Sequence, residues 1–335
     1  SVHQRPLSLA TDTNGAVWVV TDDGSVVRFD GERFAHARLD PDDSIVPLMF
    51  YSHGPAVAAI ARVRPNVLGA YRFSDSGWQQ VSTRRIDLGG PGVVDVRFLA
   101  VDDRGRFWVG IRVDNNGTMH DRGVALIDGN LPQPVQFHAR VGQGRRRVRG
   151  GAARAPDDLA AIVFDNDNHP WFAGVTGATR IIPGDMRAPA QVQTFAEAQG
   201  VRGDVVADAA RGPSGHIYVA TPDGVGRFTG ERWEFSLPGV SGGLRAVALA
   251  SDSDGVLWGA GPRGVWRYDG QHLSRLTASD GLPARPVEDV AIDGENRTWL
   301  SNEDGLTIIA RGTEPAATDD TDSSNSGSSG GDDTP

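Results

Sequence analysis

Arginine is the residue type through which this sequence could most directly bind a ligand. Five arginines lie between residues 141 and 156 with no acidic residue among them: Arg145, Arg146, Arg147, Arg149 and Arg154. Guanidinium groups form paired hydrogen bonds with carboxylates and phosphates. The stretch 112–122 adds Arg112, His120, Asp121 and Arg122. The two segments predict a site for a protein or an acidic ligand. Solvated loops without a partner are the alternative, because surface loops tolerate insertions.

Groups that could carry acid–base or metal chemistry are scattered along the chain. There is no cysteine, so a thiolate metal site is excluded. His169 and His216 each lie two residues before an aromatic residue, which favours a turn position over a metal pair. The recurring aspartates fall singly, without a second carboxylate as partner. We therefore predict no catalytic residue, no metal site and no cofactor, with weakly bound Ca²⁺ at the aspartate turns as the alternative.

A repeated pattern must position all of these groups. An Asp is followed three residues later by Gly or Asn, and three residues after that by an aromatic residue. Asp can accept hydrogen bonds from the backbone of its own turn, and Gly and Asn tolerate a left-handed backbone. The pattern therefore predicts a tight turn followed by a strand whose aromatic residue packs between repeats. The positions are Asp12 and Trp18, Asp102 and Trp108, Asp165 and Trp171, Tyr218, Asp252 and Trp258, and Asp293 and Trp299.

Two more turns follow each aromatic residue, so that one unit of about 40 residues holds four short strands. Such units are typical of the blades of a β-propeller. The sequence predicts an all-β, seven-bladed propeller of four-stranded blades over residues 1–312. The expected blades are 7–39, 45–83 (degenerate, with no key aromatic), 93–138, 159–195, 204–237, 244–276 and 287–312. The last blade needs an outer strand, for which Ser1–His3 and Thr313–Ala317 are candidates.

The repeat resembles the two-component regulator propeller repeats of bacteria, and Gly281-Leu282-Pro283 resembles the lead-in segment of that family. The resemblance covers residues 1–312. It implies the sensory or ligand-recognition part of a signalling system, commonly outside the cytoplasmic membrane. The WD40 pattern fits less well, because no Trp-Asp dipeptide ends the strands.

Two insertions interrupt the regular repeat and predict one surface. The first lengthens the connection between strands two and three of blade 3, as a loop over Arg112–Arg122. The second lengthens the connection into blade 4, over Val141–Pro156. Strand direction places both on the same face of neighbouring blades, here called the blade 3/4 face. The inner strands are mostly apolar or small, so we expect the central channel to lack converging polar groups.

Composition limits the remaining possibilities. The formal net charge is −10, which argues against bulk nucleic-acid binding. No apolar run approaches the roughly 20 residues of a membrane span. Residues 313–335 form an acidic Ser/Gly-rich stretch that predicts a disordered tail or linker. A periplasmic or extracellular location is favoured over a cytoplasmic one. We expect the protein to be a monomeric propeller or part of a larger chain or complex.

These features predict a non-catalytic binding module that acts as the ligand- or protein-recognition propeller of a bacterial signalling or assembly system. Two alternatives stay open. One is a propeller hydrolase or lyase that acts at the central channel, and the other is a structural or assembly protein.

Overall fold

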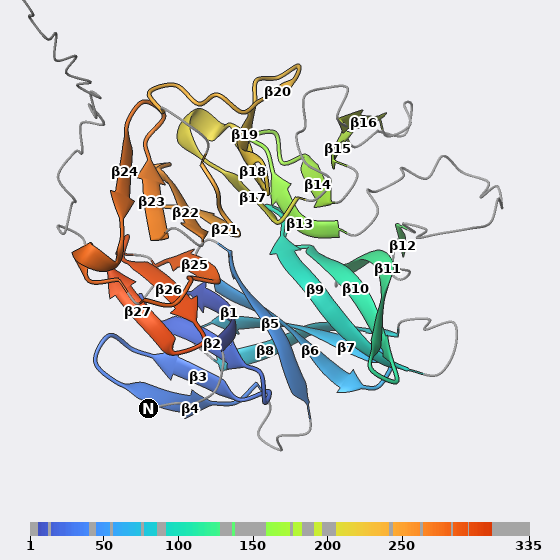
Figure 1. Cartoon of the computed structure of the whole chain (residues 1–335). Coiled ribbons are helices and arrows are strands. Elements are labelled where there is room, and N and C mark those ends of the chain that lie inside the picture. Colours follow the sequence, from blue (N-terminus) through green and yellow to red (C-terminus); the bar gives the residue numbers. More distant parts are fainter. Residues whose placement is uncertain are drawn as a thin grey trace, which may run out of the picture.

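Seven antiparallel sheets are arranged in a ring in the computed structural model (Figure 1), and their inner strands surround a central channel. The structure describes residues 6–12, 15–39, 45–53, 56–74, 77–85, 92–127, 136–137, 159–174, 177–182, 191–195, 206–240, 244–261, 264–282, 284–293 and 295–309. It confirms the predicted seven-bladed β-propeller. None of the described residues forms a helix long and apolar enough to cross a membrane.

The first four blades follow the chain in order. Blade 1 holds β1 (Pro6–Thr11), β2 (Val17–Thr21), β3 (Val26–Phe29) and β4 (Phe34–Ala37). Blade 2 holds β5 (Val46–His53), β6 (Ala56–Arg64), β7 (Val67–Ser74) and β8 (Gly77–Arg85). Blade 3 holds β9 (Val93–Val101), β10 (Phe107–Asn115), β11 (Thr118–Ile127) and β12 (Gln136–Phe137). Blade 4 holds β13 (Leu159–Phe164), β14 (Pro170–Gly174), β15 (Gly177–Ile182) and β16 (Gln191–Phe195).

Three further blades complete the ring. Blade 5 holds β17 (Asp208–Arg211), β18 (Ile217–Thr221), β19 (Gly224–Phe228) and β20 (Trp233–Glu234), with the short 3₁₀ turn η2 (Pro213–Gly215). Blade 6 holds β21 (Ala248–Ser251), β22 (Leu257–Gly261), β23 (Gly264–Tyr268) and β24 (Leu273–Leu276), followed by η3 (Ala278–Asp280). Blade 7 holds β25 (Asp289–Ile292), β26 (Thr298–Asn302) and β27 (Gly305–Ile309).

The first strand of every blade lines the channel, and each of these inner strands contacts the inner strand of the next blade. Contacts between β25 and β1 close the ring. The Thr11 hydroxyl donates to the carbonyl of Ile292 at 2.9 Å, and the Arg297 guanidinium donates to the carbonyl of Gly15 at 3.2 Å. Blade 7 has three strands in the described part of the chain. Both candidate outer strands, Ser1–His3 and Thr313–Ala317, lie outside it.

The repeated aspartate organises the turn between the first two strands. In blade 7, Oδ1 of Asp293 accepts the backbone N–H groups of Glu295 and Arg297 at 3.0 and 2.8 Å. Asn296 completes the turn with a φ of 59°, in the left-handed region that Asn tolerates. Blades 3, 4 and 6 contain the same pair of carboxylate–backbone bonds, on Asp102, Asp165 and Asp252.

The key aromatic residues lie at the interfaces between blades. Trp171 of blade 4 packs with Val219, Phe228 and Trp233 of blade 5. Trp299 of blade 7, with no exposed surface, packs with Leu9 of blade 1. Burial of large aromatic side chains is a main source of propeller stability, because each interface removes apolar surface from water.

One prediction about blade 3 is wrong. Residues 112–122 were expected to form a loop, whereas β10 and β11 continue through them as a ladder that pairs Val113 with His120 and Asn115 with Thr118. Asn116 and Gly117 form the two-residue turn, with φ angles of 54° and 83°. This Asn-Gly turn matches the twist of the flanking strands, and it therefore extends the hairpin in place of a loop.

Candidate ligand channel and recognition face

The blade 3/4 face contains part of the predicted binding surface. Arg112 lies on β10, and its guanidinium donates to Oδ2 of Asp95 on β9 at 2.8 Å. His120, Asp121 and Arg122 lie on β11. The arginines of the second segment, Arg145, Arg146, Arg147, Arg149 and Arg154, lie outside the described residues.

Blades 2 and 3 stand higher than the other described blades on this face. Strand β10 ends at Asn115, seven residues after Trp108, whereas β14 ends at Gly174, three residues after Trp171. Strand β6 of blade 2 is also nine residues long. The two tall blades are joined, because the N–H of Val94 donates to the carbonyl of Pro65 at 2.7 Å and Arg62 donates to the carbonyl of Val94 at 2.9 Å. They form a raised rim, made of β6, β7, β10 and β11.

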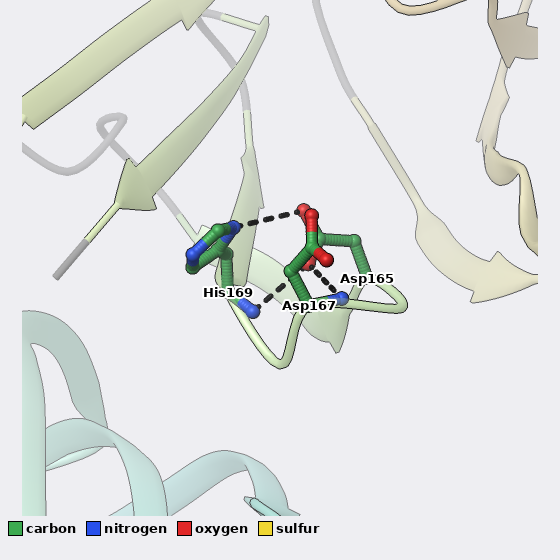
Figure 2. Close-up of side chains that lie close together, drawn as sticks. All are labelled: Asp165, Asp167 and His169. Carbon is green, nitrogen blue, oxygen red and sulfur yellow. Dashed lines mark hydrogen bonds and ion pairs between the residues drawn. The ribbon is translucent and has the colours of Figure 1, made fainter.

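A cluster of possible metal ligands lies on the opposite face, at the turn between β13 and β14. The ligand atoms of Asp165, Asp167 and His169 lie within 4.8 Å of one another, and Figure 2 shows the three side chains converging. Sequence reasoning treated these acids separately and missed the cluster. Arg180 on β15 already supplies a positive charge there: its guanidinium is 2.7 Å from Oδ2 of Asp165 and 3.7 Å from Oδ2 of Asp167.

The Arg180 guanidinium also lies 3.0 Å from Nδ1 of His169, and it therefore contacts all three residues of the cluster. Burial opposes ionisation of Asp165, but hydrogen bonds from His169 N–H and Trp171, together with the charge of Arg180, hold the pKa of Asp165 below its usual value. The guanidinium of Arg180 neutralises the negative charge of the two carboxylates, as a bound cation would. The cluster is therefore explained as an internal ion pair network.

The central channel holds a cavity of about 740 Å³ that is lined by residues from all seven inner strands. Most of the residues that line it are apolar, such as Leu9, Leu99, Ile162 and Leu249, although polar atoms contribute more than half of the exposed wall. The expectation that no polar groups converge there is wrong, because Tyr51, Asp103, Asp208 and Arg211 also line the cavity. These residues lie at or close to the ends of the inner strands, whereas the prediction considered only the apolar residues within those strands.

Asp208 lies at the end of the channel where the inner strands begin. Its Oδ2 accepts the N–H of Leu249 from the neighbouring β21, and its Oδ1 accepts the N–H of Ala209, both at 2.8 Å. The side chain touches the channel but is otherwise surrounded by protein. Burial, together with the charge of nearby Asp289, raises the pKa of Asp208 to about 7. Burial likewise raises the pKa of Asp289, at the start of β25, to about 6.

Tyr51, Asp103 and Arg211 line the cavity near the other ends of the inner strands. Burial raises the pKa of the Tyr51 hydroxyl, while the charge of Arg211 lowers it and that of Asp103 raises it. The three groups therefore lie close enough to interact. The carbonyl of Arg211 accepts a hydrogen bond from the Ser251 hydroxyl, which fixes the end of β17 to blade 6.

The comparisons with known proteins identify the fold alone. No family model and no curated protein matches the chain. Among solved structures, the extracellular domain of a protein described as a hybrid two-component system of B. thetaiotaomicron aligns with a TM-score of 0.64 at 17% identity, over 93% of this chain and 40% of that one. The chain thus spans about two fifths of the length of that solved extracellular domain.

Two other solved structures of similar fold are described as proteins of different function. A catalytically inactive virginiamycin B lyase from Staphylococcus aureus, solved with quinupristin, aligns with a TM-score of 0.56 at 13% identity, over 91% of this chain and 94% of that one. YCF48 bound to a D1 peptide aligns with a TM-score of 0.55 at 12% identity, over 91% of this chain and 93% of that one. The propeller fold is therefore shared by an extracellular domain of a two-component system, a lyase and a protein solved with a bound peptide.

Proposed function

We propose that this propeller is a non-catalytic recognition module, of the kind that detects a ligand or a protein in a bacterial signalling or assembly system. The observation that carries the proposal is the raised rim of blades 2 and 3. The strands of this rim extend past the strands of the other described blades on that face. Loops and extensions on a rigid scaffold are where proteins concentrate recognition.

The rim has the stiffness that a recognition surface requires. Arg112 is held against Asp95 at its base, and the Pro65 carbonyl ties the blade 2 hairpin to blade 3. Preorganised surfaces lose less conformational entropy on binding. The five arginines between positions 145 and 154 follow in the sequence between blade 3 and blade 4, and they provide positive charge for an acidic protein or ligand. The propellers of similar fold from a two-component system's extracellular domain and from a peptide-bound protein support this proposal.

A pull-down with two variants tests the proposal. The first variant removes Asp114, Asn115, Thr118 and Met119, which shortens the hairpin by two residue pairs and keeps the Asn116-Gly117 turn at the same hydrogen-bonding phase. The second changes Arg145, Arg146, Arg147 and Arg149 to Glu. The chain has no lysine, so it is immobilised through a terminal tag.

A partner that the intact chain captures and that both variants lose, with unchanged melting temperatures, is the expected result. Equal capture by the intact chain and the two variants would remove the blade 3/4 face as the site. A variant shortened instead at an unrelated position, the Asp22-Asp23 turn of blade 1, is the control for general disturbance of the fold.

A further inference from the structure

We propose that the central channel binds an apolar zwitterion, a small molecule whose amine contacts Asp208 and whose carboxylate contacts Arg211 and Tyr51. This site is separate from the blade 3/4 face, and the two proposals stand or fall independently. The inference begins with the cavity itself. Its volume of about 740 Å³ falls in the range of roughly 300–1,000 Å³ typical of small-molecule pockets.

A charged side chain at position 208 is not needed to join the two neighbouring inner strands. Asp208 lies ten residues before the key aromatic Tyr218, and Ser8 holds the same register before Trp18. Ser8 also bonds the next inner strand, since its hydroxyl lies 3.1 Å from the carbonyl and 3.2 Å from the N–H of Phe50. A neutral hydroxyl therefore suffices to join two blades. Burying a carboxylate there costs more, which indicates a use for its charge.

The neighbouring blades leave space around this charge. Blade 6, between Asp208 and Asp289, has Ala248 at the equivalent register. Each oxygen of Asp208 accepts one backbone hydrogen bond and keeps a second acceptor site. An ammonium group in the channel could use these sites. It would also relieve the repulsion between Asp208 and Asp289.

The opposite end offers donors. Within the described residues, neither the Tyr51 hydroxyl nor the Arg211 guanidinium has a hydrogen-bond or ion-pair partner. Tyr51 is half-buried, where a hydroxyl ordinarily finds a partner. A ligand carboxylate would accept from both groups. Asp103 and Asp165 share this end. Asp103 is exposed, so solvent screens its repulsion of an anion, and the charge of Asp165 is paired with Arg180 at 2.7 Å.

The two charged ends set the length of the ligand. Asp208 and Arg211 are the first and last residues of β17, and a strand rises about 3.3 Å per residue. Their Cα atoms are thus about 10 Å apart, the span of an extended tripeptide between its terminal charges. Most residues between them carry apolar side chains, with Leu9, Leu249 and Val290 among them, and polar atoms share the exposed wall. An apolar tripeptide and a medium-chain ω-amino acid share the required chemistry.

Calorimetric titration of the full chain with trileucine and with 8-aminooctanoate tests the proposal. At least one probe is expected to bind. Acetylating its amine or amidating its carboxylate should weaken the affinity by roughly tenfold or more, because a charge-assisted hydrogen bond is lost. Binding by trileucine alone assigns the site to peptides, and binding by 8-aminooctanoate alone assigns it to simple amino acids.

Variants of Asp208 and Arg211 test which end of the channel binds the amine of the probe and which binds its carboxylate. Asp208→Ser copies Ser8, keeps an acceptor for Leu249, and should bind the free and acetylated probes equally. Arg211→Gln should bind the free and amidated probes equally. Exposed Asp223→Asn and Arg232→Gln are the matched controls and should behave as the unmodified chain. The proposal would be overturned if neither probe bound the unmodified chain, or if the unmodified chain bound the free and the end-blocked probes with equal affinity. Both results can be obtained whether or not the variants fold.

Discussion

The indole nitrogen of Trp299 lies 2.9 Å from Oδ2 of Asp293, six residues earlier in the chain. The same bond occurs in four other blades, from Trp18, Trp108, Trp171 and Trp258 to Asp12, Asp102, Asp165 and Asp252, at 3.0 to 3.2 Å. One carboxylate thus holds the turn with Oδ1 and the interface tryptophan with Oδ2. The turn of each of these blades is thereby coupled to its contact with the next.

We expect Asp293→Asn to destabilise the fold strongly. Asp293 is 3% exposed, and its Oδ2 lies 2.6 Å from Nε of Arg297. Removing the charge weakens the bond to Arg297, which keeps its contact with exposed Glu295 at 3.1 Å, so we expect a loss of about 1.5–3 kcal/mol, typical of a hydrogen bond to a charged group. Urea unfolding measures the change. Asp252→Asn, at a less buried carboxylate, should cost less, and an equal loss in the two variants would contradict the role assigned to the Arg297 pair.

Stability should depend on pH through Asp208 and Asp289. Burial raises their pKa values to about 7 and about 6, above the ordinary 3.8. Between pH 4 and 7 the folded chain therefore binds protons that the unfolded chain has released, and the free energy of unfolding falls as the pH rises through this window. Aspartates with lowered pKa, such as Asp102 and Asp165, act below pH 4 and do not interfere.

Urea midpoints measured from pH 4.5 to 8 test this prediction. Asp208→Asn should flatten the decline, and Asp208→Asn with Asp289→Asn should flatten it further. A decline of the same slope in the double variant would assign the pH dependence to other groups.

Arg180→Gln should convert the blade 4 network into a cation site. The substitution leaves Asp165, Asp167 and His169 converging without the guanidinium, at a cost of about 1–3 kcal/mol for the loss of the charged partner of partly buried Asp165. Two carboxylates and an imidazole are suitable ligands for Zn²⁺. Zn²⁺ should therefore raise the melting temperature of the variant and leave that of the unmodified chain unchanged. Stabilisation of both proteins to the same extent would show that Arg180 does not replace a metal.

Asn296 should contribute through its side chain as well as its backbone. Its Oδ1 accepts the N–H of Ser253 at 3.1 Å, and its Nδ2 lies 2.7 Å from the Ser253 hydroxyl, so the blade 7 turn is bonded to the blade 6 turn. Asn296→Gly keeps the left-handed backbone and loses only the bonds, whereas Asn296→Ala loses both. We expect thermal unfolding to rank Asn above Gly above Ala, with steps of about 1 kcal/mol. Equal stability of the Gly and Ala variants would contradict a backbone contribution.

The sequence predicts the turns and blades well because each depends on residues a few positions apart. Asp, Gly or Asn and an aromatic at fixed spacing determine a local turn wherever they occur. The partners of the carboxylates are harder to predict. Arg106 and Arg297 reach their aspartates from two residues before the tryptophan, whereas Arg28 and Arg180 reach theirs from the third strand. An arginine on the third strand can replace one before the tryptophan only because the register between the strands brings both positions close to the aspartate.

The channel site was missed for a related reason. Asp208 lies in a run of small residues and Asp289 follows a glutamate, and neither belongs to a local motif. The same register holds Phe98 in blade 3 and Ala161 in blade 4, so the repeat pattern gives no signal there. In the hairpin of blade 3, by contrast, a local signal was available. Asn116-Gly117 is a strong hairpin turn, and it predicts the continued strands correctly.

Trp299→Ala tests how the ring is closed. Trp299 has no exposed surface, it packs against Leu9, Val17 and Val19 of blade 1, and its ring centre lies 5.3 Å from that of Phe29. Among the described residues, blades 7 and 1 are joined by this packing and by the two hydrogen bonds of Thr11 and Arg297. The cavity left by truncation should cost about 3–5 kcal/mol.

The loss should also be local to one interface. Because blades 1 and 7 would lose contact with each other before their neighbours separate, amide exchange should accelerate first in β1, β2, β25 and β26. Trp258→Ala, at a half-buried tryptophan between blades 6 and 7, is the matched control and should cost less. Uniform acceleration over all seven blades would mean that the ring opens as a single cooperative unit, and that the interface between blades 7 and 1 is no weaker than the rest.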